Sequence, residues 1–543
     1  MFLVFFISAF EGYPSDCIID GYMNKVSYDQ GETADVFINS DSVYNDKKLY
    51  LYTVNYLVVD SVTADLTPQS IINPDPWENG YGYAISFNYT IPSTLKSGMY
   101  NWGNKLFFIV KSKIKNADIT IIYPSNTEEA YNDAGEKSLY DFNSTDSRRA
   151  HIVSFLRPQT KANLDAVKVL SDGFMGWTDT LSTYDIQYIC DQDMDDIHEI
   201  ENSQIIVVIG HSEYWTRLGR LNFDQFVNSG KNAIVLSGNT MWWQVRYNED
   251  KTALICYKNV TIDPVSNTLL KTITWTTPSL YYPVLNSIGV DWPHGSLPRP
   301  GNCGWYGYKV MLPNSPLLAG TKLSFNDTIS CRSSETDGTL FAGFNDLGDP
   351  VLDTVTLGFC KTELIGYDWG ANTVNDSPSQ RGYGTFIAFR KNASSGNIIN
   401  SGFSNWCSNT QAPGWTGGFA GSDSEKIKRI TLNMFDLLLS HSSIYASPEI
   451  AECSLSSDCA GSTKGQFSVD PNPSTGKFIV QSLEYEIQEM EAYNQFGKRV
   501  FLFTPSHSYF STEIDLSTQP SGMYFLRINS GCRMDAFKLI VNH

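Results

Sequence analysis

The stretch QIIVVIGHSEYW, residues 204–215, decides the fold of the central part of the chain. It opens with a short apolar run, and two similar runs occur at 117–124, ADITIIYP, and at 232–238, NAIVLSG. Such runs are typical of strands buried on both faces of a parallel sheet. Between the run that opens this stretch and the run at 232–238, LNFDQFVNSG predicts a helix that ends near Gly230. The residues expected on its apolar face are Leu221, Phe223, Phe226 and Val227. We therefore predict a β-α-β unit in a mostly parallel sheet.

Polar residues follow the strand at the place where open parallel sheets bind their ligands. His211, Glu213 and Tyr214 come directly after it, and ligands bind beyond the carboxyl ends of such strands. We therefore expect these side chains to face a pocket. A tyrosine there can serve as a phenolate ligand to ferric iron, because metal binding lowers the pKa of the phenol. Alternatively, Tyr214 and Trp215 simply pack beneath the following helix.

Outward from this unit, the pattern of the chain indicates three modules. Residues 17–116 alternate apolar and polar positions between turn residues, which predicts an N-terminal β-sandwich. Residues 117–446 carry the buried runs and end in a helix over 426–440, which predicts an α/β domain. A linker follows over 447–466, and alternation resumes over 467–543 in a small antiparallel β-domain.

Composition excludes some classes of protein. A chain of 543 residues is long enough for about three domains. Its 58 acidic residues outnumber 39 basic ones, and the formal net charge of -19 argues against a nucleic-acid partner. No stretch approaches the about 18 apolar residues of a transmembrane helix. The start, MFLVFFISAFEG, resembles the apolar core of a secretory signal, so we expect a signal peptide over residues 1–16, although a positively charged start is missing.

Ten cysteines are spread along the chain without a C-x-x-C pair, which argues against a zinc ribbon or a thioredoxin motif. In an oxidising compartment, Cys453 and Cys459 are the first candidates for a disulfide, because they are close together in the predicted linker. The other cysteines either form pairs or remain buried free thiols.

The last module resembles the sorting domain of type IX secretion, the route used by Bacteroidetes-type bacteria. The matching residues are Pro471-Asn472-Pro473, Ser474-Thr475-Gly476, Tyr493-Asn494, Gly497, Ile514-Asp515-Leu516, Ser521-Gly522-Met523-Tyr524 and Lys538-Leu539-Ile540-Val541. The resemblance implies that the type IX secretion machinery is a partner and that the protein is secreted or held at the outer-membrane cell surface. The alternative is an ordinary accessory sandwich.

The middle of the chain resembles the family of the N,N-dimethylformamidase beta (large) subunit, over about residues 20–445. The matching segments are Ile91-Pro92, Ser97-Gly98-Met99-Tyr100, Pro124-Ser125-Asn126-Thr127, Ala130-Tyr131-Asn132, Ser138-Leu139-Tyr140, Tyr184-Asp185-Ile186, Asp191-Gln192-Asp193, Gly210-His211-Ser212-Glu213-Tyr214-Trp215, Gly238-Asn239 and Trp243-Gln244-Val245-Arg246. The resemblance implies an α/β core similar to glutamine-amidotransferase-like domains, and hydrolysis of carbon–nitrogen amide bonds. The sequence has no G-x-C-x-G elbow, which disfavours a cysteine amidase.

The same resemblance implies a mononuclear iron held by two tyrosines and a glutamate. Tyr214 matches one ligand by its motif, and Tyr184 is the best candidate for the other, with Tyr188 as the runner-up. The family's His-x-Glu falls on His294, but the glutamate position is Ser296. A neutral serine is a poor substitute for a carboxylate ligand, so the site is either rebuilt or inactive.

Three residues are the candidates for catalysis: His211, His294 and Glu335. Glu335 either supplies the missing carboxylate or matches the family's second, catalytic glutamate, a role that Asp368 could also fill. Alternatively, Glu335 and Asp337 are turn residues of a surface hairpin. Asn302 or Asn314 could donate a hydrogen bond to the developing oxyanion.

These residues leave different functions open. In the first, an exported amide hydrolase uses iron as a Lewis acid, and Glu335 or His294 transfers the proton. In the second, a non-catalytic cell-surface protein binds glycans or other ligands and keeps the fold after losing the metal site. A third, a structural adhesin, would need no pocket.

Overall fold

The computed structural model describes residues 17–159, 169–280, 282–296, 307–329, 335–368, 382–409, 423–447, 467–482, 487, 489–494, 498–503, 511–529 and 534–543. The chain forms two compact units. The first comprises Met1–Asp263, Thr272–Pro278 and Tyr282–Glu449, and the second comprises Pro264–Lys271, Ser279–Tyr281 and Ile450–His543.

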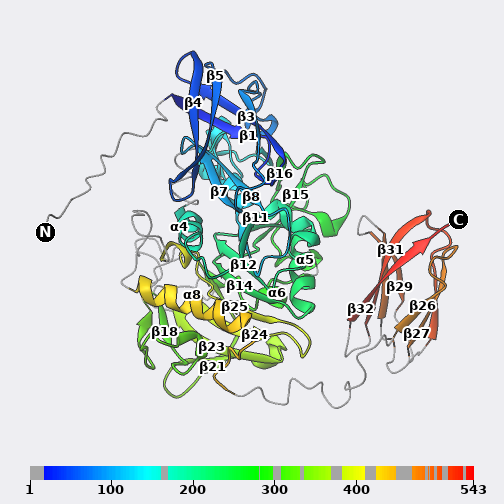
Figure 1. Ribbon diagram of the computed structural model, residues 1–543. Helices are drawn as coiled ribbons and strands as arrows, with labels where there is room; N and C mark the ends of the chain where they lie inside the picture. Colours follow the sequence, from blue (N-terminus) through cyan, green and yellow to red (C-terminus); the bar gives the residue numbers. More distant parts are fainter. Residues whose placement is uncertain are drawn as a thin grey trace. The chain divides into compact units, whose positions relative to one another are not determined.

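Two sheets lie at the start of the first unit, shown in blue in Figure 1. One has the order β1 (Ile18–Met23), β3 (Thr33–Ser40) and β6 (Phe87–Thr90). The other has the order β2 (Ser27–Asp29), β8 (Leu106–Lys111), β7 (Gly98–Trp102), β4 (Tyr44–Thr53) and β5 (Val58–Leu66). The alternating pattern forms these strands because one face of each sheet packs on a shared core, in which Trp102 and Phe108 are buried.

The largest sheet of the first unit has nine strands. Their order is β11 (Ile186–Cys190), β9 (Ile119–Tyr123), β12 (Ile205–Gly210), β14 (Asn232–Ser237), β25 (Asn397–Asn400), β24 (Gly384–Arg390), β23 (Lys361–Asp368), β18 (Tyr308–Val310) and β19 (Thr328–Ile329). The first five strands pair in parallel, and the remaining pairs are antiparallel. Every residue of β12 and β14 is buried, as the continuous apolar runs predict.

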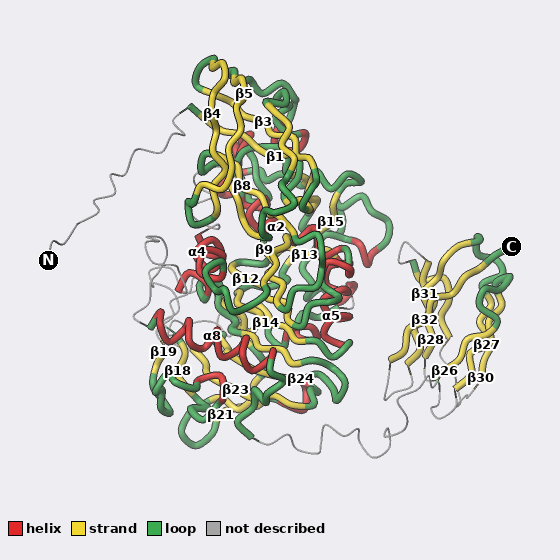
Figure 2. The backbone as a smooth tube through the Cα atoms, viewed as in Figure 1, coloured by secondary structure: helices red, strands yellow, loops and turns green. Residues whose placement is uncertain are grey.

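Helices cover both faces of this sheet, as Figures 1 and 2 show. The helices α4 (Val169–Thr178) and α8 (Ser424–Leu439) share one core with Ile205, Val207 and Ile209 of β12. On the opposite face lies α5 (Arg217–Asn228), whose first turn is capped by Thr216, because its Oγ1 accepts from the Gly219 N–H at 2.9 Å. Of the apolar face predicted for this helix, Phe223, Phe226 and Val227 are buried, but Leu221 is 48% exposed.

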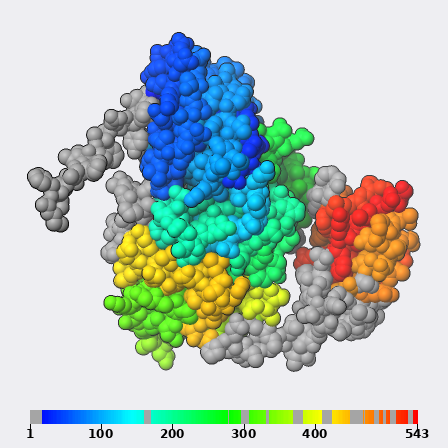
Figure 3. Space-filling view, viewed as in Figure 1, coloured from blue at the N-terminus to red at the C-terminus, as the bar shows by residue number. Residues whose placement is uncertain are grey.

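Shorter elements complete the first unit. The short helices are α1 (Pro76–Asn79), α2 (Ser125–Tyr131), α6 (Leu285–Ile288) and α7 (Thr354–Leu357). A four-stranded sheet has the order β10 (Ile152–Ser154), β16 (Ala253–Ile255), β15 (Trp243–Tyr247) and β13 (Tyr214–Thr216). Two further pairs of strands are β17 (Asp291–Ser296) with β20 (Thr336–Gly338), and β21 (Phe341–Phe344) with β22 (Pro350–Leu352). The β-sandwich strands pack directly onto the central part (Figure 3). Lys111 of β8 joins them by ion pairs to Asp193 at 2.9 Å and to Glu199 at 2.6 Å.

The second unit is built from antiparallel strands. One sheet has the order β26 (Phe467–Asp470), β27 (Lys477–Ser482) and β30 (Ser511–Asp515), and the other has the order β29 (Arg499–Phe503), β28 (Glu489–Asn494), β31 (Gly522–Asn529) and β32 (Met534–Val541). Both sheets contribute to a core of their own, which includes Phe478, Met490 and Leu526.

The cysteines of the described residues are mostly thiols. Cys17, Cys190, Cys256 and Cys407 are free and buried, whereas Cys360 is disulfide-bonded. The predicted pair Cys453 and Cys459 lies outside the described residues, as do residues 1–16 of the predicted signal peptide. Within the part of the chain that the structure describes, no helix is both long enough and apolar enough to cross a membrane.

The burial of β12 predicts how strongly this strand stabilises the protein. Ile209 is fully buried in the core shared with α4 and α8. We expect Ile209→Ala to reduce the free energy of unfolding by about 2–5 kcal/mol, because it leaves a cavity in a packed core. Urea denaturation followed by tryptophan fluorescence measures the change. Leu221→Ala, at a 48% exposed position, is the control and should change stability by less than about 0.5 kcal/mol. Equal effects of both substitutions would contradict the placement of β12.

Candidate functional site

A cluster of polar side chains lies at the carboxyl edge of the parallel strands. His211 and Glu213 follow β12, Asn239 follows β14, and Glu335 directly precedes β20. Gly210 ends β12 with a φ of 70°, a conformation that favours glycine and turns the chain out of the sheet. His211 and Glu213 have side chains only 6% and 3% exposed, whereas Glu335 keeps 16% of its side chain accessible. The cluster is therefore deeply buried, and the side chain of Glu335 is more accessible to solvent than those of His211 and Glu213.

His211 is oriented by a hydrogen bond to the main chain. Its Nδ1 lies 3.0 Å from the carbonyl oxygen of Gly238, which can only accept, so Nδ1 carries a hydrogen and donates it. The other ring nitrogen, Nε2, lies 3.3 Å from Glu335 Oε2 and 3.5 Å from Glu213 Oε2. Nε2 is therefore the nitrogen that can gain or lose a proton, and it does so between two carboxyl groups.

The local charges set the protonation of this group. Burial acts to lower the pKa of His211, but the negative charges of Glu335 and Glu213 outweigh it, so the pKa lies above the usual value. Burial also raises the pKa of Glu335, against the opposing effect of His211. The two groups titrate as a pair and can share one proton. A shared proton of this kind is suited to acid–base chemistry.

Two tyrosines hold Glu213 in place. The Tyr140 hydroxyl donates to Glu213 Oε2 at 2.7 Å, and the Tyr131 hydroxyl donates to the same oxygen at 3.4 Å. The Glu213 N–H donates to Thr127 Oγ1 at 2.9 Å. Burial raises the pKa of both tyrosines well above the usual value, so the phenols stay neutral and act as donors. Glu213 is thus a fixed hydrogen-bond acceptor beside His211.

A second acid–base pair lies beyond the cluster. His294 Nδ1 lies 2.6 Å from Asp291 Oδ1, and this hydrogen bond raises the pKa of His294 against the effect of burial. Pairing of β17 with β20 brings this pair beside Asp337, which is fully buried. Asp337 Oδ2 accepts the Thr240 N–H at 2.9 Å, while its Oδ1 makes no hydrogen bond among the described residues. Burial, with some help from the charge of Asp291, raises the pKa of Asp337 to about 8.

The structure brings together only some of the residues predicted from the sequence. His211, Glu335 and Tyr214 lie in the same region, and His294 lies on the strand next to β20. Tyr184 does not join them. It precedes β11, and its hydroxyl donates to Asp436 of α8 at 2.7 Å. Since β11 and β12 run in parallel, Tyr184 lies at the amino edge of the sheet and Tyr214 beyond the carboxyl edge, and a strand of this length separates the two edges by about 17 Å.

The other predicted residues lie apart from the cluster or outside the described part. Tyr188, the runner-up ligand, is buried in β11 and shares a hydrogen bond with Thr178 of α4 at 2.9 Å. Asn314 is exposed on the surface, and Asn302 lies outside the described residues. The backbone of Ser296 pairs with Thr336, the residue after Glu335. Glu335 therefore lies next to Ser296, the position at which the resemblance to the family implies a ligand glutamate.

An iron held by Tyr184 and Tyr214 does not fit this arrangement. The two side chains lie at opposite edges of the sheet, and the hydroxyl of Tyr214 accepts a hydrogen bond from Lys258 Nζ at 2.7 Å. Among the residues that the structure describes, no group of three or more His, Cys, Asp or Glu side chains has the geometry of a metal site.

Three residues of this region were not assigned a role from the sequence: Tyr131, Tyr140 and Lys258. Tyr131 and Tyr140 belong to segments that match the family pattern, which is the signal that could have identified them. Lys258 lies in a loop after β16 and has no such signal. Burial lowers the pKa of its amine to about 8.

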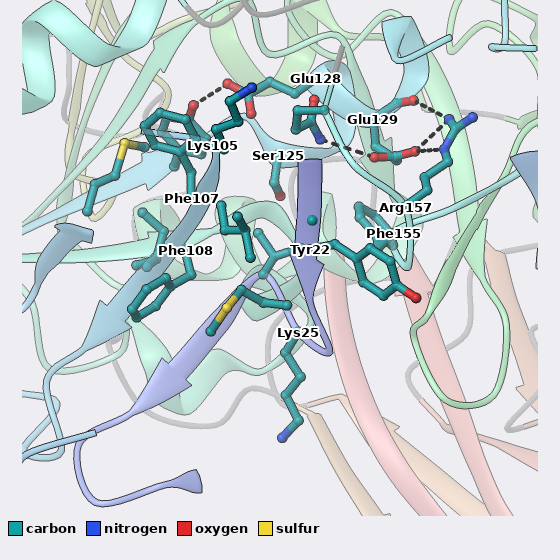
Figure 4. A pocket seen from close by; sticks show the side chains of 18 residues that line it. Tyr22, Lys25, Lys105, Phe107, Phe108, Ser125, Glu128, Glu129, Phe155 and Arg157 are labelled. Atoms are coloured by element: carbon teal, nitrogen blue, oxygen red, sulfur yellow. Dashed lines mark hydrogen bonds and ion pairs between the residues drawn. The ribbon is translucent and has the colours of Figure 1, made fainter. Parts of the chain in front are cut away.

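A separate pocket lies between the β-sandwich strands and α2 (Figure 4). Tyr22, Phe107 and Phe155 form part of its wall, and Arg157 faces Glu129, with Nη2 and Oε1 2.6 Å apart. Both members of this ion pair are fully buried and satisfy each other. His211 does not line this pocket, which is therefore distinct from the acid–base cluster.

These features define a class of protein. It is β-rich with several sheets, and it has a buried histidine–carboxylate site at the carboxyl edge of its parallel strands. The chain belongs to the N,N-dimethylformamidase beta subunit-like, C-terminal family, whose model matches residues 54–416. The model of the secretion system C-terminal sorting domain matches residues 468–542. Both resemblances recognised in the sequence are thereby confirmed. A search of curated proteins gives no match.

The sorting domain bears on where the protein acts. A domain of this kind implies handling by the type IX secretion system and export to the cell surface or outside the cell. The disulfide-bonded state of Cys360 agrees with an oxidising destination.

The buried Asp337 predicts a pH-dependent stability. Its pKa in the folded protein is about 8, above the ordinary value of 3.8. The neutral form therefore favours folding, and its contribution is complete below about pH 4 and is lost as the pH rises towards 8. We therefore compare the free energy of unfolding of Asp337→Asn with that of the wild type. Between pH 5 and pH 8.5, we expect this difference to shift in favour of the variant by more than about 1 kcal/mol.

Urea denaturation at several pH values measures this difference. Asp291 and His211 face the same region and are present in both proteins, so the difference between the two curves isolates Asp337. Asp346→Asn, at an exposed position, is the matched control and should give parallel curves. A constant difference between Asp337→Asn and the wild type at all pH values would contradict the assignment.

Proposed function

We propose that this protein is an exported hydrolase that cleaves carbon–nitrogen amide bonds at the His211–Glu335 pair. Membership of the dimethylformamidase-like family supports the reaction class, and the sorting domain supports export. The observation that carries the proposal is the orientation of His211, whose Nδ1 is held by Gly238 while Nε2 lies 3.3 Å from Glu335. A buried imidazole and carboxyl group that share a proton are suited to activate water and protonate a leaving amine.

The proposed reaction uses one water molecule. The His211–Glu335 pair takes a proton from water as the water oxygen attacks the amide carbon. The carbon–nitrogen bond then breaks, and the pair returns the proton to the leaving amine, which gives a carboxylic acid and an amine. Glu213, held by the Tyr140 hydroxyl at 2.7 Å, keeps the imidazole facing Glu335 and stabilises its charged form. His294 and Asp337 lie one strand away and are proposed to act on the charge of this pair rather than on the substrate.

The metal expected from the family does not enter these steps. Iron bound by Tyr184 and Tyr214 would require two side chains from opposite edges of the sheet to meet. The proposal therefore assigns the proton transfers to residues of the chain. It also includes a core similar to glutamine-amidotransferase-like domains, which the five parallel strands support, and a place at the outer surface of a Bacteroidetes-type cell.

The second candidate is a non-catalytic binding protein. A cluster of tryptophans favours it, because Trp242 lies 5.9 Å from Trp243 and 6.5 Å from Trp292 between ring centroids, and all three are half-buried. Aromatic faces of this kind offer large apolar contact area with a polar handle to a ligand such as a glycan. A binding protein would keep these rings and would not need the protonation of His211.

Hydrolysis assays distinguish the two candidates. We expect the full chain to release amine or ammonia from at least one member of a panel of small amides and short peptides. Glu335→Gln and His211→Gln should each lower kcat by about 10²–10⁴-fold, because they remove the group that transfers the proton.

The exposed pair His198 and Glu201 provides matched controls, since it joins the same residue types at 2.6 Å with side chains 74% and 44% exposed. His198→Gln and Glu201→Gln should leave kcat unchanged. Turnover that survives in Glu335→Gln would place the chemistry elsewhere. Absence of any turnover in the wild type, together with binding of a glycan, would favour the binding protein.

A further inference from the structure

The amine of Lys258 is held at the phenol oxygen of Tyr214. Lys258 Nζ donates a hydrogen bond to this oxygen at 2.7 Å, and Tyr214 itself is fully buried. An ammonium group has donors and no acceptor, so the phenol oxygen must be the acceptor. The atom through which a tyrosine would bind iron is therefore already in contact with a positively charged group.

Aromatic rings surround this ammonium group. Nζ lies 3.7 Å from the ring centroid of Tyr140, 4.7 Å from that of Trp243 and 5.2 Å from that of Tyr214. A cation within about 6 Å of a ring centroid is attracted by the negative face of the ring. The three rings attract the charge of Lys258 and fix its position next to Tyr214, although burial lowers the pKa of the amine to about 8.

Hydrogen bonds connect this charge to the carboxylate of the site. Tyr214 accepts from Lys258, and a side-chain hydrogen bond also joins Tyr214 to Tyr140. Tyr140 in turn donates to Glu213 Oε2 at 2.7 Å. Lys258, Tyr214 and Tyr140 are thereby linked to Glu213 by consecutive hydrogen bonds.

The backbone at Lys258 adopts an uncommon conformation, which the exposed Lys251 shares. Its φ is 55°, in the left-handed region of backbone conformation. Residues other than glycine, asparagine and aspartate rarely adopt this conformation. Such conformations persist where the surrounding structure determines them, and they gather at functional sites. Here the left-handed residue is the one whose side chain turns inward onto Tyr140 and Tyr214.

We propose that Lys258 takes the place of a metal ion at Tyr214, and that its ammonium group supplies positive charge to Glu213 through Tyr214 and Tyr140. An iron ion at the Tyr214 oxygen would lie directly beside this ammonium group, and the two positive charges would repel each other. The inference goes beyond the proposed activity, because it concerns what occupies Tyr214 and holds whether or not amides are the substrate. It also accounts for a chain that keeps the Tyr214 motif while Ser296 replaces a carboxylate ligand.

Iron titration of the full chain tests this inference. Ferric iron is added, the excess is removed, and both the iron content and the visible absorption spectrum are measured. We expect less than stoichiometric iron in the wild type and no tyrosinate-to-iron band. Stoichiometric iron with a visible band that is lost in Tyr214→Phe would overturn the proposal.

Substitutions of Lys258 provide a second, independent arm. Lys258→Met leaves the buried Tyr214 oxygen without its donor and should lower the unfolding temperature, whereas Lys258→Arg keeps the charge and should recover part of the loss. Lys251→Met is the matched control, because Lys251 has a 46% exposed side chain above the ring of Tyr247, and it should unfold at the wild-type temperature. An unfolding temperature of Lys258→Met equal to that of the control would show that the site does not depend on this charge. Neither readout requires a substrate, so failure here is distinguishable from failure of the proposed hydrolysis.

Discussion

Burial of β12 and β14 on both faces is the constraint on which the rest of the structure depends. Because these strands are continuous apolar runs, they can only lie in the middle of a sheet covered by helices. The polar residues that follow these strands therefore lie at the carboxyl edge of the sheet. His211, Glu213 and Asn239 are found there. Packing of the core thereby determines which polar groups come together, and burial determines how their charges behave.

Electrostatics at this edge follow from the same burial. Carboxyl groups of Glu213, Glu335 and Asp337 are brought into a region from which water is largely excluded, so each additional negative charge is costly. Three arrangements compensate for these negative charges. His211 lies between two of the carboxyl groups, Asp337 holds a proton, and Lys258 is tied through two phenols to Glu213. The proton transfer proposed for the His211–Glu335 pair takes place among these charges.

The sequence predicted those features that depend on local pattern. The runs at 117–124, 204–210 and 232–238 became parallel strands, and the helix predicted over 426–440 begins two residues earlier, at Ser424. The motif after β12 predicted that His211 lies at the carboxyl edge of the sheet, and the structure places it there. By contrast, Tyr184 was chosen by its motif alone, and a motif does not tell at which edge of the sheet a residue lies. Lys258 could not be found at all, since a lone lysine in a loop carries no periodicity or spacing, and only the tertiary fold brings it to Tyr214.

A double-mutant cycle between His211 and Glu335 tests the central claim most directly, because it measures their interaction in the folded protein without a substrate. The free energies of unfolding are compared for the wild type, His211→Gln, Glu335→Gln and the double variant at neutral pH. A buried pair that shares a proton predicts a coupling energy of at least about 1 kcal/mol, since each single variant leaves the other group without its partner. Additive effects, with a coupling energy near zero, would show that the two side chains do not act as a pair and would contradict the account of the site.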